Sequence, residues 1–361
     1  MDKHLMKEIF NAIQRGDLSS LESHTKGRDV CWPECTQGKL KDTAIHIAVQ
    51  LDKIELVDWL LSHGCAACLE QQNGDGKRPL HSSVQSCNLL ATKMLIDYNV
   101  EVNPLKRADW TPLMLACTRQ SVPLISILLD HGADPLLVNK DGWSSFHVAC
   151  REGNVEVLEH LLKVNSKLWN TVSKNGRAPL HTAALHGHED VVNFLINNCG
   201  YPADQQDSCG NTPLMDAMRM GHRNIASLLL FQHNANINAR DKMGCSVLNV
   251  AAEAGQDDIV NWLVKDLGVH VNTLSNTTGM SALHSAAKEG HVLMLQTLVE
   301  LGCNLNTKDN RGRNCLWLAC GSRHKECVRK LLSLGATDDS DLNGIRPSKL
   351  MPFAGLVEQI L

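Results

Sequence analysis

The apolar residues of this chain form short helical patterns that return at a fixed interval. Between positions 139 and 165, Phe146, Val148 and Ala149 are spaced to share one buried helix face. A second run follows Gly153, with the i, i+3, i+4 spacing of an amphipathic helix. Neither predicted helix can bury its apolar face alone, so we expect similar stretches on both sides to cover it. The residues of the second run are Val155, Val157, Leu158, Leu161 and Leu162.

A hexapeptide related to Thr-Pro-Leu-His-x-Ala marks the start of the first helix in each stretch. Successive copies begin 32 to 35 residues apart, and in eight of ten a glycine stands two positions before the copy. This motif at a period near 33 is typical of ankyrin repeats. The resemblance covers nearly the whole chain and implies an all-α ankyrin-repeat solenoid of about ten helix-turn-helix units, with hairpin loops and terminal caps. The copies begin at Thr43, Arg78, Thr111, Ser144, Ala178, Thr212, Ser246, Ser281, Asn314 and Arg346.

The two ends of the chain depart from the repeat pattern, as the caps of a stack must. We predict an N-terminal capping half-repeat at 1–30 and an irregular insertion at 31–40. The ankyrin array then covers 41–344, and a capping repeat covers 345–361. One continuous array replaces the two or three globular domains that 361 residues would otherwise suggest.

Composition excludes several classes of protein. The net charge is -4 and no long Lys/Arg run occurs, which disfavours direct binding to nucleic acid. No apolar run is long enough to span a membrane or to serve as a secretory signal. The fourteen cysteines are scattered, as expected for small apolar side chains in a reduced compartment. We therefore expect a cytoplasmic monomer without membrane contact, and the nucleus stays open as a second location.

Metal and catalytic chemistry have little support in the sequence. The histidines at the fourth hexapeptide position lie about one repeat apart, so we expect them to bridge neighbouring turns rather than to share an ion. A zinc site on Cys31, Cys35, Cys65 and Cys68 is the weaker alternative, because the spacing matches no common zinc module. No phosphate-binding loop or nucleophile elbow occurs. The prediction is a protein without metal or cofactor that is not an enzyme. The histidines concerned are His46, His81, His147, His181 and His284.

Two tryptophans stand out just before the hexapeptide, where most repeats have a small or polar residue. Trp110 and Trp143 are 33 residues apart, with Arg107 in the first of the two loops. Indoles flanked by cations could form a protein-binding hot spot. Alternatively, each indole could fold back to shield its own hairpin. Trp110, Trp143 and Arg107 are the predicted partner-binding residues.

Residues 106–119, 130–153, 207–222 and 281–290 resemble a narrower family, the ankyrin-repeat co-regulators of alanyl-tRNA synthetase. The resemblance implies that alanyl-tRNA synthetase is the partner. It also implies that lysine side chains capture serine misactivated by the synthetase, which limits serine mischarging of alanine tRNA. The alternative is a generic ankyrin scaffold that binds another protein without a covalent step.

The same resemblance places the serine acceptors at three positions. Lys140 matches one of them, whereas Arg107 and Asn170 occupy the other two. A guanidinium stays protonated and cannot act as a nucleophile. Nearby lysines are therefore expected to substitute. The serine-acceptor candidates are Lys140, Lys106, Lys167 and Lys174.

Overall fold

The computed structural model describes residues 3–51 and 53–352, and these residues form the predicted all-α stack of helix pairs. The chain divides into two compact units, Met1–Lys174 and Asn175–Leu361. The elements of the first unit are α1 Lys3–Arg15, α2 Leu18–Thr25, η1 Trp32–Glu34, β1 Thr36–Gln37, β2 Asp42–Thr43, α3 Ala44–Ala48, α4 Ile54–Ser62, η2 Cys65–Cys68, α5 Pro79–Gln85, α6 Leu89–Asp97, η3 Arg107–Asp109, α7 Pro112–Thr118, α8 Val122–Asp130, α9 Ser145–Glu152, α10 Val155–Val164 and η4 Leu168–Asn170.

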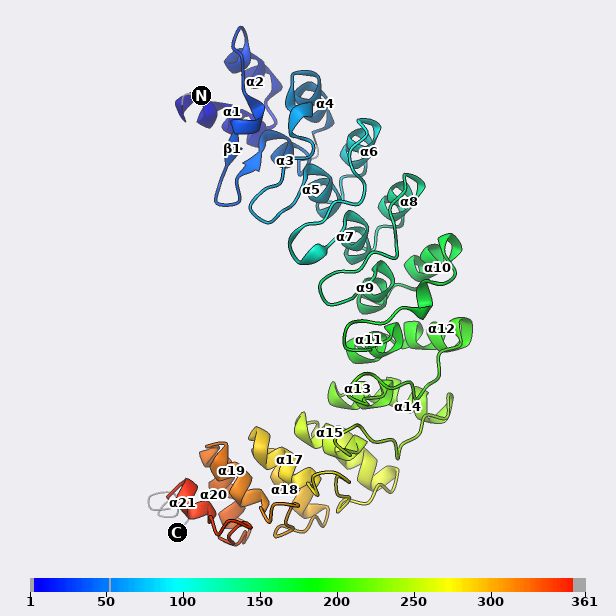
Figure 1. Ribbon diagram of the computed structural model, residues 1–361, viewed down its shortest axis with the longest axis vertical. Coiled ribbons are helices and arrows are strands. Elements are labelled where there is room, and N and C mark those ends of the chain that lie inside the picture. The colour runs from blue at the N-terminus through cyan, green and yellow to red at the C-terminus, as the bar shows by residue number, and fades with distance from the viewer. Residues whose placement is uncertain (1–2, 52, 353–361) are drawn as a thin grey trace. The chain divides into compact units, whose positions relative to one another are not determined.

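In the first unit, the helices pack in two rows. Helices α3, α5, α7 and α9, the first of each pair, lie side by side, and α4, α6, α8 and α10 form the second row (Figure 1). The hairpin loops that join successive pairs project beyond the first row (Figure 1). The apolar face of each short helix is thereby covered by its own partner and by the neighbouring pairs.

The second unit repeats this plan. Helices α11, α13, α15, α17 and α19 contact one another in sequence, and α21 packs on α19. One helix pair ends in a turn of π-helix, η5. The elements are α11 Pro179–His186, α12 Glu189–Cys199, α13 Pro213–Arg219, α14 Arg223–Phe231, α15 Val247–Glu253, α16 Asp257–Asn261, η5 Trp262–Asp266, α17 Ala282–Glu289, α18 Val292–Glu300, α19 Cys315–Gly321, α20 Lys325–Ser333 and α21 Pro347–Leu350.

The ends of the chain differ from the repeats between them. Helices α1 and α2 form a pair without the hexapeptide, and α1 packs on α3. Within the segment 31–40, Trp32 is buried and strand β1 pairs with β2 in an antiparallel ladder. Of the predicted C-terminal cap at 345–361, only residues up to 352 are among the described ones.

The hexapeptide begins each first helix by satisfying its free backbone N–H groups. The Thr111 side chain accepts a hydrogen bond from Met114 N at 3.2 Å, and Pro112 occupies the first helical position, where no intrahelical donor is needed. In the next repeat, α9 ends at Gly153 with φ +82°, a left-handed conformation that suits glycine. Local sequence therefore sets both helix boundaries.

In several repeats, the fourth hexapeptide residue ties the repeat to the next one. His181 Nδ1 accepts the N–H of Ala178 at 3.2 Å, so Nε2 carries the proton and donates to Asn211 O at 3.0 Å. Asn249 makes the same two contacts with its amide, accepting from Ser246 N and donating to Met280 O. The predicted bridging role of these side chains is confirmed at His181 and, with matching bonds to the next repeat, at His46, His81 and His284.

Successive hairpins are also joined through their backbones. In the first unit, the N–H groups of Arg107, Lys140 and Lys174 each donate to a carbonyl of the preceding hairpin at 3.0 Å. A left-handed residue two positions before the hexapeptide allows this approach. Where glycine is absent there, Lys41 and Asp109 take φ +53° and +60°. The left-handed turn therefore persists even where the sequence does not supply a glycine.

We expect His181→Asn to make the protein less sensitive to acid. Burial lowers the pKa of His181 from 6.5 to about 4, so below pH 6.5 the unfolded chain binds a proton that the folded state excludes. The free energy of unfolding therefore falls as the pH drops from 6.5 towards 4. His181 accounts for about 2 kcal/mol of this loss at pH 5. Asparagine does not titrate in this pH range, and Asn249 shows that its amide can make the same two contacts. His181→Asn should therefore remove the contribution of His181 to the loss of stability.

The measurement is chemical unfolding at pH 7 and pH 5. His181→Ala is the control, because it breaks both hydrogen bonds and should destabilise the protein at either pH. An equal loss of stability on acidification in the wild type and in His181→Asn would contradict the prediction.

We expect Gly142→Ala to weaken the connection between hairpins. Gly142 has φ +80°, and a Cβ there would lie 2.6 Å from Lys174 N. The clash adds to the cost of a left-handed alanine, for a total of about 2 kcal/mol or more. Gly132→Ala is the matched control, since Gly132 has φ +87° but no atom within 4 Å of a Cβ. Equal unfolding free energies for the two variants would show that the clash is relieved.

Candidate protein-binding site on the hairpins of the first unit

Trp110 and Trp143 are brought together by a residue that lies between them, Arg151. The Arg151 guanidinium carbon is 5.7 Å from the Trp110 ring centroid and 5.8 Å from that of Trp143. Lys106 Nζ lies 5.6 Å from the Trp110 ring, and the rings of Trp143 and His147 are stacked with centroids 6.3 Å apart. We call these five residues the tryptophan–arginine cluster.

Three local features position the cluster. Lys106 and Trp110 face each other across an antiparallel bridge, with Lys106 N donating to Trp110 O at 3.0 Å. The Trp143 N–H donates to the Asn139 side chain, which is buried in the turn of the next hairpin. Arg151 lies in the last turn of α9, within one helical turn of His147. The two indoles are therefore held by different hairpins.

Both indoles are half-buried. Each indole packs against the Arg151 guanidinium. The site therefore combines features of the two predicted arrangements, the protein-binding hot spot and the indole that shields its own hairpin. Arg151 also forms an ion pair with Glu152. Each contact between the guanidinium and a ring is worth about 0.5–1 kcal/mol. The cluster is thus a preformed aromatic and cationic surface.

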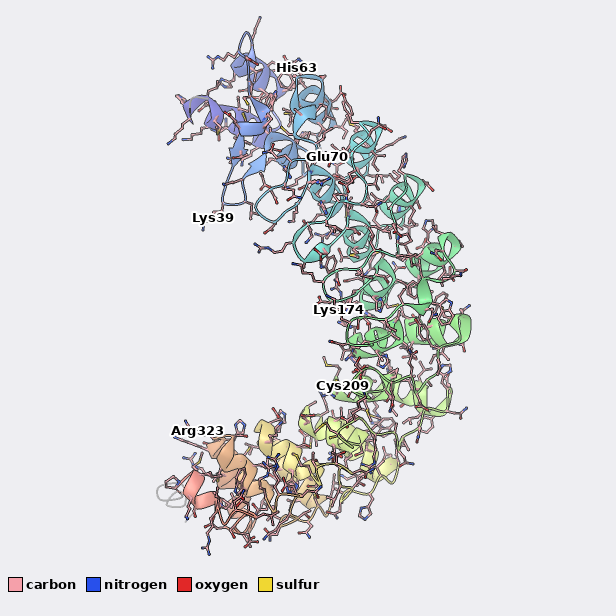
Figure 2. The ribbon with its side chains drawn as sticks, viewed as in Figure 1. Lys39, His63, Glu70, Lys174, Cys209 and Arg323 are labelled. Carbon is pink, nitrogen blue, oxygen red and sulfur yellow. The ribbon has the colours of Figure 1, made fainter. Side chains whose placement is uncertain are left out.

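The four candidate lysines differ in their surroundings. Partial burial lowers the pKa of Lys106, and the nearby Lys77 ammonium lowers it further, whereas Asp75 acts in the opposite direction. Lys140 and Lys174 are exposed on the next two hairpins, and Figure 2 shows Lys174 on the hairpin side. Lys167 lies elsewhere, in the loop before η4. The structure therefore gathers Lys106, Lys140 and Lys174 on one side of the unit and leaves Lys167 apart.

Arg107 extends from the third hairpin. Its side chain is 76% exposed, and Nη1 lies 3.9 Å from Asp75 Oδ1. The pair is long and solvated, so it contributes little to stability. The guanidinium is consequently available to a partner.

The predicted zinc alternative concerns cysteines near the N-terminus. Among residues 3–51 and 53–352, no three His, Cys, Asp or Glu side chains are grouped to hold an ion. Burial, together with neighbouring cysteines, raises the pKa of both Cys35 and Cys68 to about 11. The zinc alternative stays a prediction.

Sequence reasoning missed Arg151 and Lys77. Arg151 stands at the end of a first helix, where a solvated cation is common, and only the packing of adjacent repeats reveals that it lies between two indoles. The effect of Lys77 on Lys106 depends on the approach of two hairpins 29 positions apart in the sequence. The feature of the sequence that points to this site is the unusual pair Trp110 and Trp143.

Comparison with known proteins agrees with the repeat architecture. The family model for ankyrin repeats in three copies matches residues 9–106, 93–171, 164–241, 180–275 and 248–342. The chain is 34% identical over 123 residues to human transient receptor potential cation channel subfamily A member 1, covering 34% of this chain and 11% of that protein. Mouse protein phosphatase 1 regulatory subunit 27 is 35% identical over 88 residues, covering 22% of this chain and 54% of that protein.

Human SH3 and multiple ankyrin repeat domains protein 2 is 31% identical over 123 residues, which are 34% of this chain and 6% of that protein. The chain thus spans only a minor part of the long relatives and about half of the phosphatase subunit. In the described residues, none of the helices combines the length and the apolar character that crossing a membrane requires.

We expect Arg151→Met to uncouple the two tryptophans. The substitution should cost about 1–2 kcal/mol of unfolding free energy, because two cation–π contacts are lost. In a Trp143→Leu background the same substitution should cost about 0.5–1 kcal/mol less. A double-mutant cycle by chemical denaturation measures this coupling. A coupling energy of zero would mean that the guanidinium and the indole do not interact.

Proposed function

The chain belongs to the ankyrin-repeat family, and we propose that it is a protein-interaction module whose recognition surface is the hairpin side of its first unit. The tryptophan–arginine cluster carries this proposal. Aromatic and arginine side chains provide most of the energy in protein interfaces when they are central and well packed. Most other repeats have a small or polar residue at the position that Trp110 and Trp143 occupy.

The hairpins also suit this role because they are ordered before a partner arrives. Backbone hydrogen bonds join the hairpins of Arg107, Lys140 and Lys174 to their predecessors. A surface that loses little conformational freedom on binding keeps more of its contact energy as affinity. The exposed cations of these hairpins add long-range attraction to an acidic partner.

The test is recovery of partners by the full chain and by the double variant Trp110→Ala/Trp143→Ala. The variant should lose at least about tenfold of the captured partner if the cluster is the hot spot. Phe231→Ala is the control, because Phe231 is an exposed aromatic, 66% accessible, outside the hairpins of the first unit. Unchanged capture by the double variant, or equal loss by Phe231→Ala, would refute the assignment of the site.

We further propose that the partner is alanyl-tRNA synthetase and that hairpin lysines accept misactivated serine. This proposal rests on the likeness of residues 106–119 and 130–153 to ankyrin repeat domain-containing protein 16. The placement of three candidate lysines beside the tryptophan–arginine cluster supports it. A partner docked on the cluster would lie close to Lys106 and Lys140.

The chemistry requires a neutral amine. Lysine Nζ attacks the carbonyl carbon of seryl-adenylate, a C–N bond forms, the bond to the phosphate oxygen breaks, and AMP leaves while the amine proton passes to solvent. The lowered pKa of Lys106 enlarges its neutral fraction, which suits it to act as an acceptor. The product is an amide, so each lysine reacts once and the module is consumed rather than catalytic.

Incubation of the chain with alanyl-tRNA synthetase, serine and ATP, followed by peptide mass spectrometry, tests the capture step. We expect seryl-lysine at Lys106 or Lys140. When both lysines are changed to Arg, we expect more alanine tRNA to be charged with serine. Alanine in place of serine is the control substrate. Complex formation without seryl-lysine would remove the covalent step and leave a non-covalent scaffold.

A further inference from the structure

Three successive hairpins of the first unit expose an aliphatic side chain and a cation two residues apart. The aliphatic residues are 45%, 47% and 53% accessible, which is high for apolar side chains. The described hairpins of the other repeats lack this combination of an apolar residue followed by a cation. The pairs are Leu105 with Arg107, Val138 with Lys140, and Val172 with Lys174.

The residue between each pair points the other way. Asn139 and Ser173 are 3% and 6% accessible, and Lys106 is half-buried against Trp110. Side chains alternate along extended backbone, so residues two apart share a face. The aliphatic and cationic side chains of each pair therefore lie on the same exposed face. We call this surface the hairpin stripe.

The hairpin stripe has a regular spacing. Lys140 N binds Ala108 O and Lys174 N binds Asp141 O, both at 3.0 Å, so neighbouring hairpins are in direct backbone contact. The helices behind them pack at about 8–10 Å, which sets the step from one pair to the next. A peptide in polyproline II conformation rises about 3.1 Å per residue and has three residues per turn, so every third side chain lies on one face. A partner segment of this kind crossing the stripe would advance about three residues per hairpin and present the same face to each hairpin.

The charge of the stripe selects an acidic partner. The exposed face of the stripe carries three cations, Arg107, Lys140 and Lys174, although the whole chain has a net charge of -4. Within the described residues, Lys140 and Lys174 take part in no ion pair. Lys140 and Lys174 are therefore not neutralised by a carboxylate, and Arg107 has only its long, solvated contact with Asp75.

We propose that the hairpin stripe binds a protein segment in polyproline II conformation, with Asp or Glu at every third residue and apolar side chains between them. The acidic side chains pair with Arg107, Lys140 and Lys174, and the apolar ones cover Leu105, Val138 and Val172. This inference rests on the proposed protein-binding function and specifies the chemistry of the partner. The segment runs beside the tryptophan–arginine cluster, which would contact a separate part of the same partner.

The test uses two fluorescent twelve-residue peptides and the full chain, with binding followed by anisotropy. One peptide repeats Glu-Leu-Ser four times, and the other has the same composition with its four glutamates contiguous. The repeated peptide should bind about tenfold more tightly, because only its carboxylates have the same spacing as the cations on successive hairpins. Its affinity should also fall with added salt.

Three variants locate the site. Arg107→Glu/Lys140→Glu/Lys174→Glu should weaken binding of the repeated peptide at least about tenfold. Val138→Ser/Val172→Ser should weaken it about threefold through lost apolar contact. The control Lys93→Glu/Lys163→Glu reverses exposed charges on α6 and α10 and should change binding less than about twofold.

Equal affinity for the two peptides would overturn the proposal, because net charge alone would then account for binding. An equal loss in the α6 and α10 control would do the same. Tighter binding of single-stranded RNA of similar length, lost in the triple variant, would assign the stripe to nucleic acid instead. If partner capture depends on Trp110 and Trp143 while the peptides fail to discriminate, the proposed function stands and this inference fails.

Discussion

The hydrogen bond from one repeat's buried side chain to the next repeat's carbonyl is the recurring interaction that couples neighbouring repeats within both units. First helices of five to eight residues are too short to persist alone in water. His46, His81, His181 and His284 each hold their own helix cap with one nitrogen and the following hairpin with the other. Cap, helix and hairpin therefore form together, and each pair is stable only beside a neighbour.

Much of this organisation could be predicted from the sequence because it is local. Hexapeptide, glycine and period determine where helices begin, where hairpins turn and which faces are apolar. The exceptions needed the structure. Asn249 reproduces the contacts of histidine, and Asp109 adopts a left-handed φ without being glycine. At both positions, contact with the neighbouring repeat accompanies a geometry that the local sequence pattern does not predict.

The candidate site was predictable only in part for the same reason. Trp110 and Trp143 attract attention as departures from the repeat pattern. Arg151 does not, because its role arises from contacts across two repeats. The lowered pKa of Lys106 likewise depends on burial and on a cation from another hairpin. The stacking residues recur and follow local rules, whereas the residues that could recognise a partner depend on tertiary neighbours.

The position of Arg151 between indoles of two repeats has a thermodynamic consequence. If either repeat unfolds locally, the Arg151 guanidinium loses its contact with one of the two indoles, and the aromatic surface is lost. Recognition therefore requires both repeats to be folded and in register. By linkage, a partner that binds this surface must suppress such opening. Amide hydrogens of α7 and α9 would then exchange more slowly in the complex. Binding at this site therefore depends on whether the two repeats that form it are folded.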